Sequence, residues 1–349
     1  MDIEQRKERW RNLYRPGSGK FVFLIPYFEH PVEAPLFWPD RMQERVDYGV
    51  RLYEAQLERA RWLDDDFIPC LFPATGTEIY AEALGSSVYR PRNNMPFARH
   101  CVENASQAAR LKVPDPSRTR LMDLVELGRR IREKAGADAP MKLVDVQSPM
   151  DILAQIWDKT DLFASMMDED CEELILELSG KICGFLIRFW DIWFEEFGTS
   201  YISHCPDYYM EGGITLSADE IGNVSPALYG KYFHEELNRI SRHFGGIGIH
   251  CCADSRHQWA GLKRVEGLRM LNLCRELPVL QEGYRYFTDC AHAPLYLLNG
   301  VAQTMPDMFP SDFPTGTRAV IVQRAASRRE AVEKAERLRE ACRMEDIGL

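Results

Sequence analysis

The sequence predicts an α/β protein of the (β/α)8 or TIM-barrel class, with an N-terminal helical extension and long loops at the mouth where the strands end. Eight short apolar runs are spread along the 349 residues, and helical segments lie between most of them. The stretch "PYFEHPVEAPLFW" after the first run has no glycine-rich turn, which argues against a doubly wound sheet that binds a dinucleotide. A barrel is then the simplest closure of the strands, and 1–349 is expected to form one domain.

The predicted strands are short, apolar and rich in β-branched or aromatic residues. They are 20–28, 67–72, 141–146, 200–205, 246–252, 268–273, 294–300 and 318–324. Because 26–66 is long for a strand-to-helix connection, we expect helices there that cover the barrel mouth. Residues 1–66 thus hold the N-terminal arm, the first strand and this lid, and 67–349 hold the remainder of the barrel.

The predicted helices have recognisable ends. A serine and a glutamate with capping-box spacing begin 327–344, and a serine followed by a proline begins 225–245. Glycines end 225–245 and 121–136, as expected for helix C-termini. The segment 168–197 is predicted as one long helix, or as two helices joined near its central glycines. Its excess of aromatic side chains indicates a core helix, with a homodimer interface as a further use of the same face.

The composition excludes several kinds of partner. The formal net charge of −10 argues against nucleic acid and against an anionic membrane surface, because both attract a basic face. The N-terminal stretch 1–20 is charged throughout, and the most apolar segment, 182–197, contains four charged residues, so neither a secretory signal nor a membrane span is predicted. The 10 cysteines have no CxxC spacing, which is typical of reduced thiols. A cytoplasmic location is expected.

A candidate metal site lies at the end of the strand 246–252, which reads "GIGIHCC". His250 and Cys252 are two residues apart, so on a strand both side chains project from the same face, whereas Cys251 points to the other. An imidazole and a thiolate at the carboxyl end of a barrel strand are suitable zinc ligands. The alternative interpretation is a histidine and a cysteine that are simply buried in the core.

Further ligands and catalytic groups are expected on the same edge. If consecutive strands are neighbours, the strand 200–205 brings Cys205 to the metal as the third ligand, or His204 in its place. Asp207 follows that strand, and Asp219 and Glu220 lie in the loop segment "GGITLSADE". These three carboxylates are the predicted catalytic residues, although each is also typical of a solvated surface.

Aromatic residues near the strand ends suggest a substrate pocket. Tyr27 and Trp38 follow the first strand, and Tyr208 and Tyr209 follow the strand 200–205. Together they would form an apolar wall suited to an aromatic or macrocyclic ligand. Packing beneath long loops is the alternative interpretation for all four.

Several segments resemble the uroporphyrinogen decarboxylase superfamily. They are "QSPMDILAQIWDKTDLFASMMDEDCEELILELSGKICGFL", "GGITLSADEIGNVSPALYGKYF" before the H-x-C strand, "PLYLLNG", and "TGTRAVIVQRAASRREAVEKAERLRE". The resemblance covers most of the chain from about residue 60 and implies a (β/α)8 barrel. True decarboxylases of this superfamily carry an arginine-rich motif after the first strand. The stretch "LIPYFEHPVEAP" contains no arginine, so a substrate with many carboxylates would lack its clamps.

The resemblance is closer to the zinc methyltransferases of the superfamily, which work with corrinoid (cobalamin) proteins. It implies that His250 and Cys252 hold Zn2+ and that a partner protein carries the corrinoid. A methyl group would move between this corrinoid and either a thiol or a small O- or N-methylated compound. With the methylated compound, the reaction would be a demethylation. This branch takes a third ligand from a cysteine after the last strand. Here that strand continues "VIVQRAAS" without a cysteine, and Ala253 replaces the usual glycine after H-x-C.

Two other functions remain open from the sequence. A lyase-type or decarboxylase-like relative would act on another carboxylate without a metal, and its activity would survive chelators. A non-catalytic barrel would bind a tetrapyrrole or a partner protein without turnover.

Overall fold

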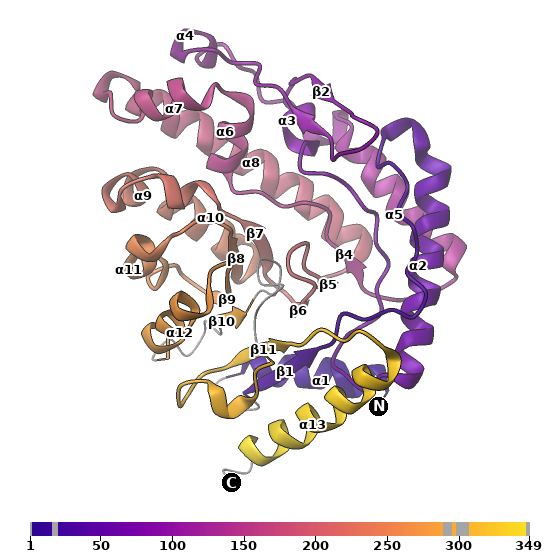
Figure 1. Cartoon of the computed structure of the whole chain (residues 1–349). Helices are drawn as coiled ribbons and strands as arrows, with labels where there is room; N and C mark the ends of the chain where they lie inside the picture. The colour runs from indigo at the N-terminus through magenta and orange to yellow at the C-terminus, as the bar shows by residue number, and fades with distance from the viewer. Residues whose placement is uncertain (1, 16–19, 289–294, 298–306, 347–349) are drawn as a thin grey trace.

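The strands lie in the middle of the molecule and most helices lie around them (Figure 1). The computed structural model describes residues 2–15, 20–288, 295–297 and 307–346. The largest sheet is parallel and has the order β10-β9-β8-β7, from strands Leu295–Leu297, Leu268–Leu273, Ile247–Cys251 and Ile214–Ser217. A second parallel pair joins β1 (Phe21–Leu24) to β11 (Ala319–Val322), so the two ends of the chain are held together.

The remaining strands form smaller groups. β4 (Met141–Lys142) pairs in parallel with β5 (Ser200–Ile202), which pairs antiparallel with β6 (Tyr209–Glu211). β2 (Val88–Tyr89) and β3 (Phe97–Ala98) form a separate hairpin. Isolated parallel bridges link Leu71 to Met141 and Gln147 to Ser217. The described residues therefore show an α/β fold built largely on parallel strands, and their pairings do not show a closed eight-stranded barrel.

Two strand predictions differ from the structure. The run 67–72 contributes only the bridge at Leu71, because Pro69 has no N–H to donate to a ladder. The segment assigned to a loop before Asp219 instead contains β7, which pairs directly with β8. The neighbour of β8 on this side is therefore β7 and not the strand that begins at 200. Of the run 294–300, only β10 lies in the described residues.

The helices are as follows: α1 Ile3–Tyr14, α2 Met42–Trp62, α3 Ile79–Ala83, α4 Ala105–Ala108, α5 Leu121–Ala135, α6 Pro149–Ile156, α7 Lys159–Ser165, α8 Glu172–Phe197, α9 Pro226–Tyr232, α10 His234–Phe244, α11 Trp259–Leu262, α12 Leu277–Tyr286 and α13 Arg328–Asp346. Short 3-10 turns cover Pro39–Arg41, Pro116–Arg118, Glu169–Cys171, Glu220–Asn223, Arg256–Gln258 and Pro310–Asp312.

The helix ends follow the local sequence signals. Gly136 ends α5 and Gly245 ends α10, each with positive φ (58° and 76°), a conformation that favours glycine. The backbone N–H of Glu330 donates to the Ser327 hydroxyl at the start of α13. The predicted helix 225–245 is divided into α9 and α10 at Phe233, whereas 172–197 is one continuous helix.

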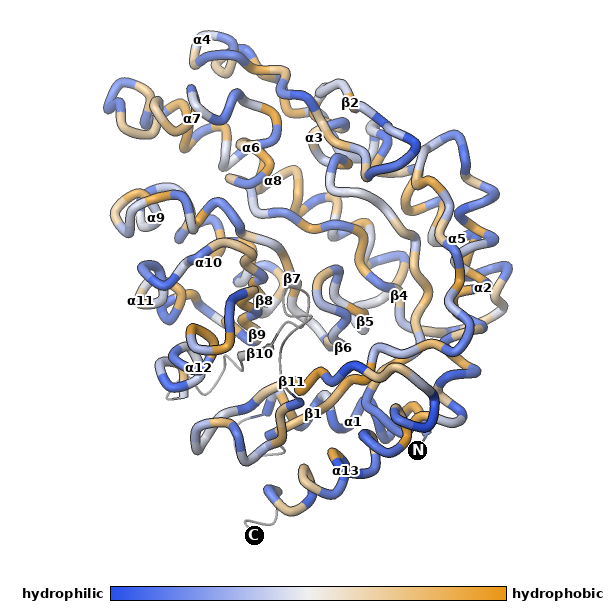
Figure 2. Tube along the Cα trace, viewed as in Figure 1, coloured by the Kyte–Doolittle hydropathy of each residue, from blue (hydrophilic) through white to orange (hydrophobic). Residues whose placement is uncertain are grey.

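The core lies between the strands and the inner faces of the helices. Figure 2 shows hydrophobic and hydrophilic stretches alternating along helices such as α13, as expected for helices with one face on the core. On α8 the aromatic side chains are buried, and the rings of Trp193 and Phe197 are 4.7 Å apart. The predicted core role of this helix is thus confirmed.

The segment expected to cover the barrel mouth consists mainly of one long helix. α2 packs along α5 so closely that a Cβ at Gly49 would lie 2.6 Å from Ile131 Cδ1. The stretch 25–38 between β1 and the first 3-10 turn contains no helix or strand. Among the described residues, no helix combines the length and the apolar character needed to cross a membrane.

Candidate metal centre

Three adjacent parallel strands bring their carboxyl ends to one edge of the sheet. β8 lies between β7 and β9, with Ser217 paired to His250 and His250 paired to Asn272. Since side chains two residues apart share a face, His250 and Cys252 project beside Asn272 and Cys274 of the next strand. Asp219 follows β7 directly and reaches the same edge.

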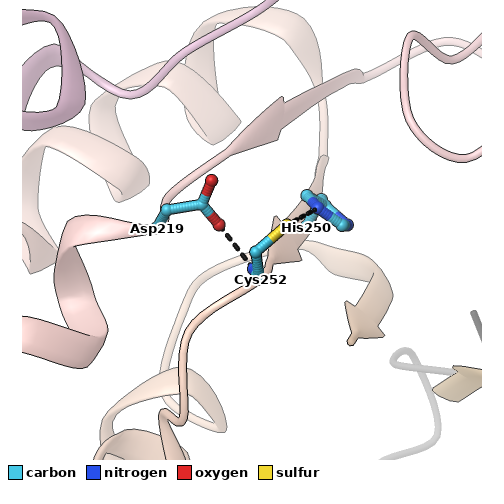
Figure 3. A group of neighbouring side chains, drawn as sticks. All are labelled: Asp219, His250 and Cys252. Carbon is cyan, nitrogen blue, oxygen red and sulfur yellow. Dashed lines mark hydrogen bonds between the residues drawn. The ribbon is translucent and has the colours of Figure 1, made fainter. Parts of the chain in front are cut away.

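Three potential metal ligands meet at this edge (Figure 3). One ligand atom each of Asp219, His250 and Cys252 lies within 4.8 Å of the others. His250 Nε2 is 2.9 Å from Cys252 Sγ, and a carboxylate oxygen of Asp219 accepts a 2.5 Å hydrogen bond from the Cys252 backbone N–H. His250 is buried whereas Cys252 is exposed, so the group has one closed side and one open side.

Asn272 determines which nitrogen of His250 faces the thiol. Its Oδ1 lies 2.5 Å from His250 Nδ1, and because an amide oxygen only accepts, Nδ1 carries the proton. Nε2 then points toward Cys252. Burial lowers the pKa of His250, but hydrogen bonds to Cys205 and Cys252 outweigh it and raise this pKa to about 11.

The two other predicted metal ligands have different positions. Cys205 Sγ lies near the His250 ring, 3.9 Å from Nε2 and 4.0 Å from Nδ1. His204 does not join the group, because its Nε2 lies 2.9 Å from the Ser217 hydroxyl. Burial holds the pKa of His204 well below its usual value, so its ring is neutral.

Of the three predicted catalytic carboxylates, only Asp219 lies in the metal-ligand group. Asp207 is paired with Lys142 Nζ at 2.5 Å, and its side chain is 51% exposed. Both oxygens of Glu220 have partners, Lys159 Nζ at 2.6 Å and Asn223 Nδ2 at 2.9 Å. These two residues therefore have ion-pair and hydrogen-bond partners of their own.

The four predicted pocket aromatics make packing contacts. Tyr208 is buried against Trp10 of α1, with ring centroids 5.3 Å apart, and the Tyr209 hydroxyl donates to Glu211 at 2.5 Å. Tyr27 contacts Trp62 edge-on at 6.2 Å. Trp38 carries the guanidinium of Arg41 above its ring at 5.5 Å. These contacts correspond to the packing alternative for all four residues.

Three residues of the site region were not predicted from the sequence. Asn272 and Cys274 alternate in "LNLC" at the end of β9, a signal that becomes informative only once β9 is known to lie beside β8. Asp151 on α6 is buried and accepts hydrogen bonds from the backbone N–H groups of Asp219 (2.8 Å) and Glu220 (3.0 Å). Burial raises the pKa of Asp151 to about 8. The two hydrogen bonds that Asp151 accepts connect α6 to the segment that carries Asp219.

Comparison with known proteins adds a shared fold. No family model matches the sequence, and no curated protein is similar to it at a significant level. Among solved structures, a methyltransferase from Methanosarcina mazei is similar over 98% of this chain and 98% of its own, with a TM-score of 0.64. The two sequences are 14% identical, so the likeness shows the fold and carries no residue-level assignment.

Proposed function

We propose that this protein is a zinc-dependent methyltransferase of the uroporphyrinogen decarboxylase superfamily, folded as a single (β/α)8-type domain. It would move a methyl group between a corrinoid held by a partner protein and a thiol or a small O- or N-methylated compound. One observation carries the proposal: Asp219, His250 and Cys252 converge at adjacent strand ends. The fold shared with a methyltransferase supports it.

The donor set fits zinc. Imidazole nitrogen, thiolate sulfur and carboxylate oxygen are the ligand types that zinc binds in proteins. A ligating histidine usually donates its other ring N–H to a fixed acceptor, and Asn272 Oδ1 is that acceptor for His250. The exposed side of Cys252 leaves an approach from solvent for a substrate.

A zinc ion at this position would act as a Lewis acid that favours the thiolate form of an acceptor thiol or polarises the oxygen of a methyl ether. The chain's own residues hold and orient the ligands. Asn272 keeps the proton on His250 Nδ1, and Asp219 fixes the backbone at Cys252. Asp151 in turn holds the backbone of Asp219.

Methyl transfer to a thiol has a simple balance. A sulfur–carbon bond forms as the cobalt–carbon bond of the methylated corrinoid breaks, the electron pair stays on cobalt, and the thiol releases its proton. In the demethylation direction a corrinoid in the cobalt(I) state would supply the electron pair for the new cobalt–carbon bond, while the methyl–oxygen or methyl–nitrogen bond breaks and the leaving group keeps its electron pair and takes up a proton. The reaction needs no oxidant or reductant beyond the two reactants.

The direct test is methyl transfer from methylcobalamin to small thiols by the zinc-loaded protein, followed by the absorbance change of the corrinoid. We expect transfer by the wild type and its loss in His250→Ala and Cys252→Ala. Cys101→Ala, which alters an exposed cysteine with no part in the metal-ligand group, is the matched control and should retain wild-type rates. Methyl ethers and methylamines are then tested with the corrinoid in its reduced cobalt(I) state as acceptor.

Other outcomes would contradict the proposal. Decarboxylation of a carboxylate substrate that persists after chelation would indicate the metal-independent lyase. Tight binding of cobalamin or a porphyrin without methyl transfer to any substrate would indicate a non-catalytic tetrapyrrole-binding protein.

A further inference from the structure

We infer that a hollow between α2, α3 and α5 binds the head group of a small α-amino acid, with Arg45 holding the carboxylate and Glu78 holding the ammonium group. The residues that line this hollow include Phe37, Arg45, Thr75, Glu78, Ile79 and Leu121. None of its lining residues belongs to the metal-ligand group. The inference goes beyond the proposed function and does not depend on it.

Arg45 is a buried cation that makes no ion pair within the described part of the chain. Its side chain lies on α2 and is only 4% exposed. Its Nη2 donates to the Ala74 carbonyl at 2.9 Å, whereas its Nε has no hydrogen-bond partner among the residues that the structure describes. Burial lowers the pKa of Arg45 to about 10, so the guanidinium is still charged at neutral pH. A buried charge is costly unless a counter-ion pairs with it.

Glu78 is the buried anion of the same hollow. It is also 4% exposed, and its Oε2 lacks a hydrogen-bond partner in the described residues. A Cβ at Gly76 would overlap this oxygen, so the glycine leaves room for the carboxylate. Burial raises the pKa of Glu78, as expected for a carboxyl group with too little positive charge beside it.

The other charged side chains of the hollow already have partners. Glu82 lies 2.6 Å from Arg90 and 3.5 Å from Arg120, and Arg120 also lies 3.4 Å from Asp123. Arg45 and Glu78 line the same hollow, but in the structure they do not pair with each other. A ligand with a negative and a positive group on neighbouring atoms would pair with both.

The free space limits the ligand to a small head group. It measures about 30 Å³, which holds about two to three water-sized groups. The carboxylate and the amino group of an α-amino acid have this size, and the apolar side chains of Phe37, Ile79 and Leu121 suit the carbon atom that joins them. Arg120 and Asp123 are half exposed and lie at the opening, so the side chain of a larger amino acid would point toward them.

Both charges of the ligand are needed. A guanidinium binds a carboxylate through two parallel N–H···O bonds, and a carboxylate accepts the N–H groups of an ammonium ion. A carboxylic acid without the amino group would pair with Arg45 and leave Glu78 unpaired, and an amine would do the reverse. Because an unpaired buried charge is costly, the zwitterion should bind more tightly than either half.

Ligand-observed NMR of the full chain with L-alanine tests the inference. Saturation-transfer titrations give the dissociation constant of L-alanine, and acetate, ethylamine and glycine betaine are the comparison probes. We expect L-alanine to bind at least about 10-fold more tightly than acetate or ethylamine. Glycine betaine carries both charges but has no N–H donor, and it should bind as weakly as the two half-molecules.

Substitutions locate the ligand. Arg45→Met and Glu78→Gln should each weaken the binding of L-alanine by at least about 10-fold. Arg51→Met and Glu54→Gln alter exposed residues of α2 outside the hollow, and these matched controls should bind L-alanine as the wild type does. Circular dichroism and the unfolding midpoint show whether each variant is folded, and the series of probes on the wild type needs no variant.

Several results would overturn the inference. Equal affinity for acetate and L-alanine would indicate a simple carboxylate site, and equal affinity for glycine betaine would show that Glu78 accepts no N–H from the ligand. No binding of L-alanine at millimolar concentrations would indicate that the hollow holds only water. Wild-type affinity in folded Arg45→Met or Glu78→Gln protein would place the ligand elsewhere on the chain.

Discussion

At the scale of the residue, the contact between His250 and Asn272 decides which ring nitrogen of His250 is free to bind the metal. Asn272 is fully buried, and its Oδ1 fixes the proton on His250 Nδ1. Replacing it by Leu removes this acceptor while keeping the number of side-chain heavy atoms and the branch at Cγ. We expect zinc affinity to fall by about 10- to 100-fold, the usual effect of losing the partner of a ligating histidine. Competition with a chromophoric chelator measures this affinity.

A matched control for this substitution is Asn238→Leu on α10. Asn238 is also buried, and its side chain accepts from the Glu266 backbone N–H, away from the metal-ligand group. It should lower stability without changing zinc affinity. Equal zinc affinity in Asn272→Leu and the wild type would show that the His250–Asn272 contact has no role in metal binding.

Glu236 on α10 gives a prediction on pH dependence. Burial raises the pKa of its carboxyl from the ordinary 4.5 to about 8, and its Oε2 has no hydrogen-bond partner among the described residues. Between these two values the folded protein holds a proton that the unfolded chain releases. The stabilisation from this group is complete below pH 4.5 and is lost as the pH rises toward about 8.

Glu236→Gln should remove this dependence. Between pH 6 and pH 8, the free energy of unfolding of the wild type should fall relative to the variant by about 2 kcal/mol. Urea unfolding at several pH values measures the difference. Glu235→Gln, an exposed neighbour on the same helix, should keep the wild-type slope. A wild type and a Glu236→Gln variant with parallel pH profiles would contradict the raised pKa.

At the scale of the element, β1 depends on charged side chains as well as on β11. The backbone N–H groups of Phe23 and Ile25 donate to the carboxylates of Asp66 and Asp65, each at 2.9 Å. Arg59 of α2 pairs with Asp65 at 2.5 Å, and both side chains are buried. Side-chain carboxylates thus satisfy strand donors that a regular neighbouring strand would satisfy in a complete ladder.

Breaking this pair should be costly. Arg59→Met leaves the buried carboxylate of Asp65 without its main partner, and we expect a loss of about 3–5 kcal/mol in the free energy of unfolding. Arg61→Met on the exposed side of the same helix should change it by less than about 0.5 kcal/mol. Urea denaturation of both variants provides the comparison. A loss below 1 kcal/mol for Arg59→Met would contradict the structural role of this pair.

The elements also show what sequence patterns can and cannot reveal. Helix ends at Gly136 and Gly245 were predictable, because their signals are local. Strand β7 was assigned to a loop, because four residues are too few for a clear period. That omission left β8 with the wrong neighbour. The role of Asn272 depends on which strands lie side by side, and strand order is set by packing across the whole chain.

At the scale of the whole molecule, the α/β class and the alternation of strands and helices were predictable, and the likeness to a methyltransferase structure supports the fold. The pair His250 and Cys252 was also predictable, because strand periodicity alone puts both side chains on one face. Of the three carboxylates predicted from the sequence, Asp219 lies beside this pair in the structure. Asp207 and Glu220 have other partners.

The central claim is that the ends of β7, β8 and β9 form one metal site. Elemental analysis of the full chain, purified without chelators, tests it most directly. One zinc ion per chain in the wild type, lost in both His250→Ala and Cys252→Ala and retained in Cys101→Ala, is the expected result. Wild-type protein without bound zinc, or variants of His250 and Cys252 that retain it in full, would contradict the claim.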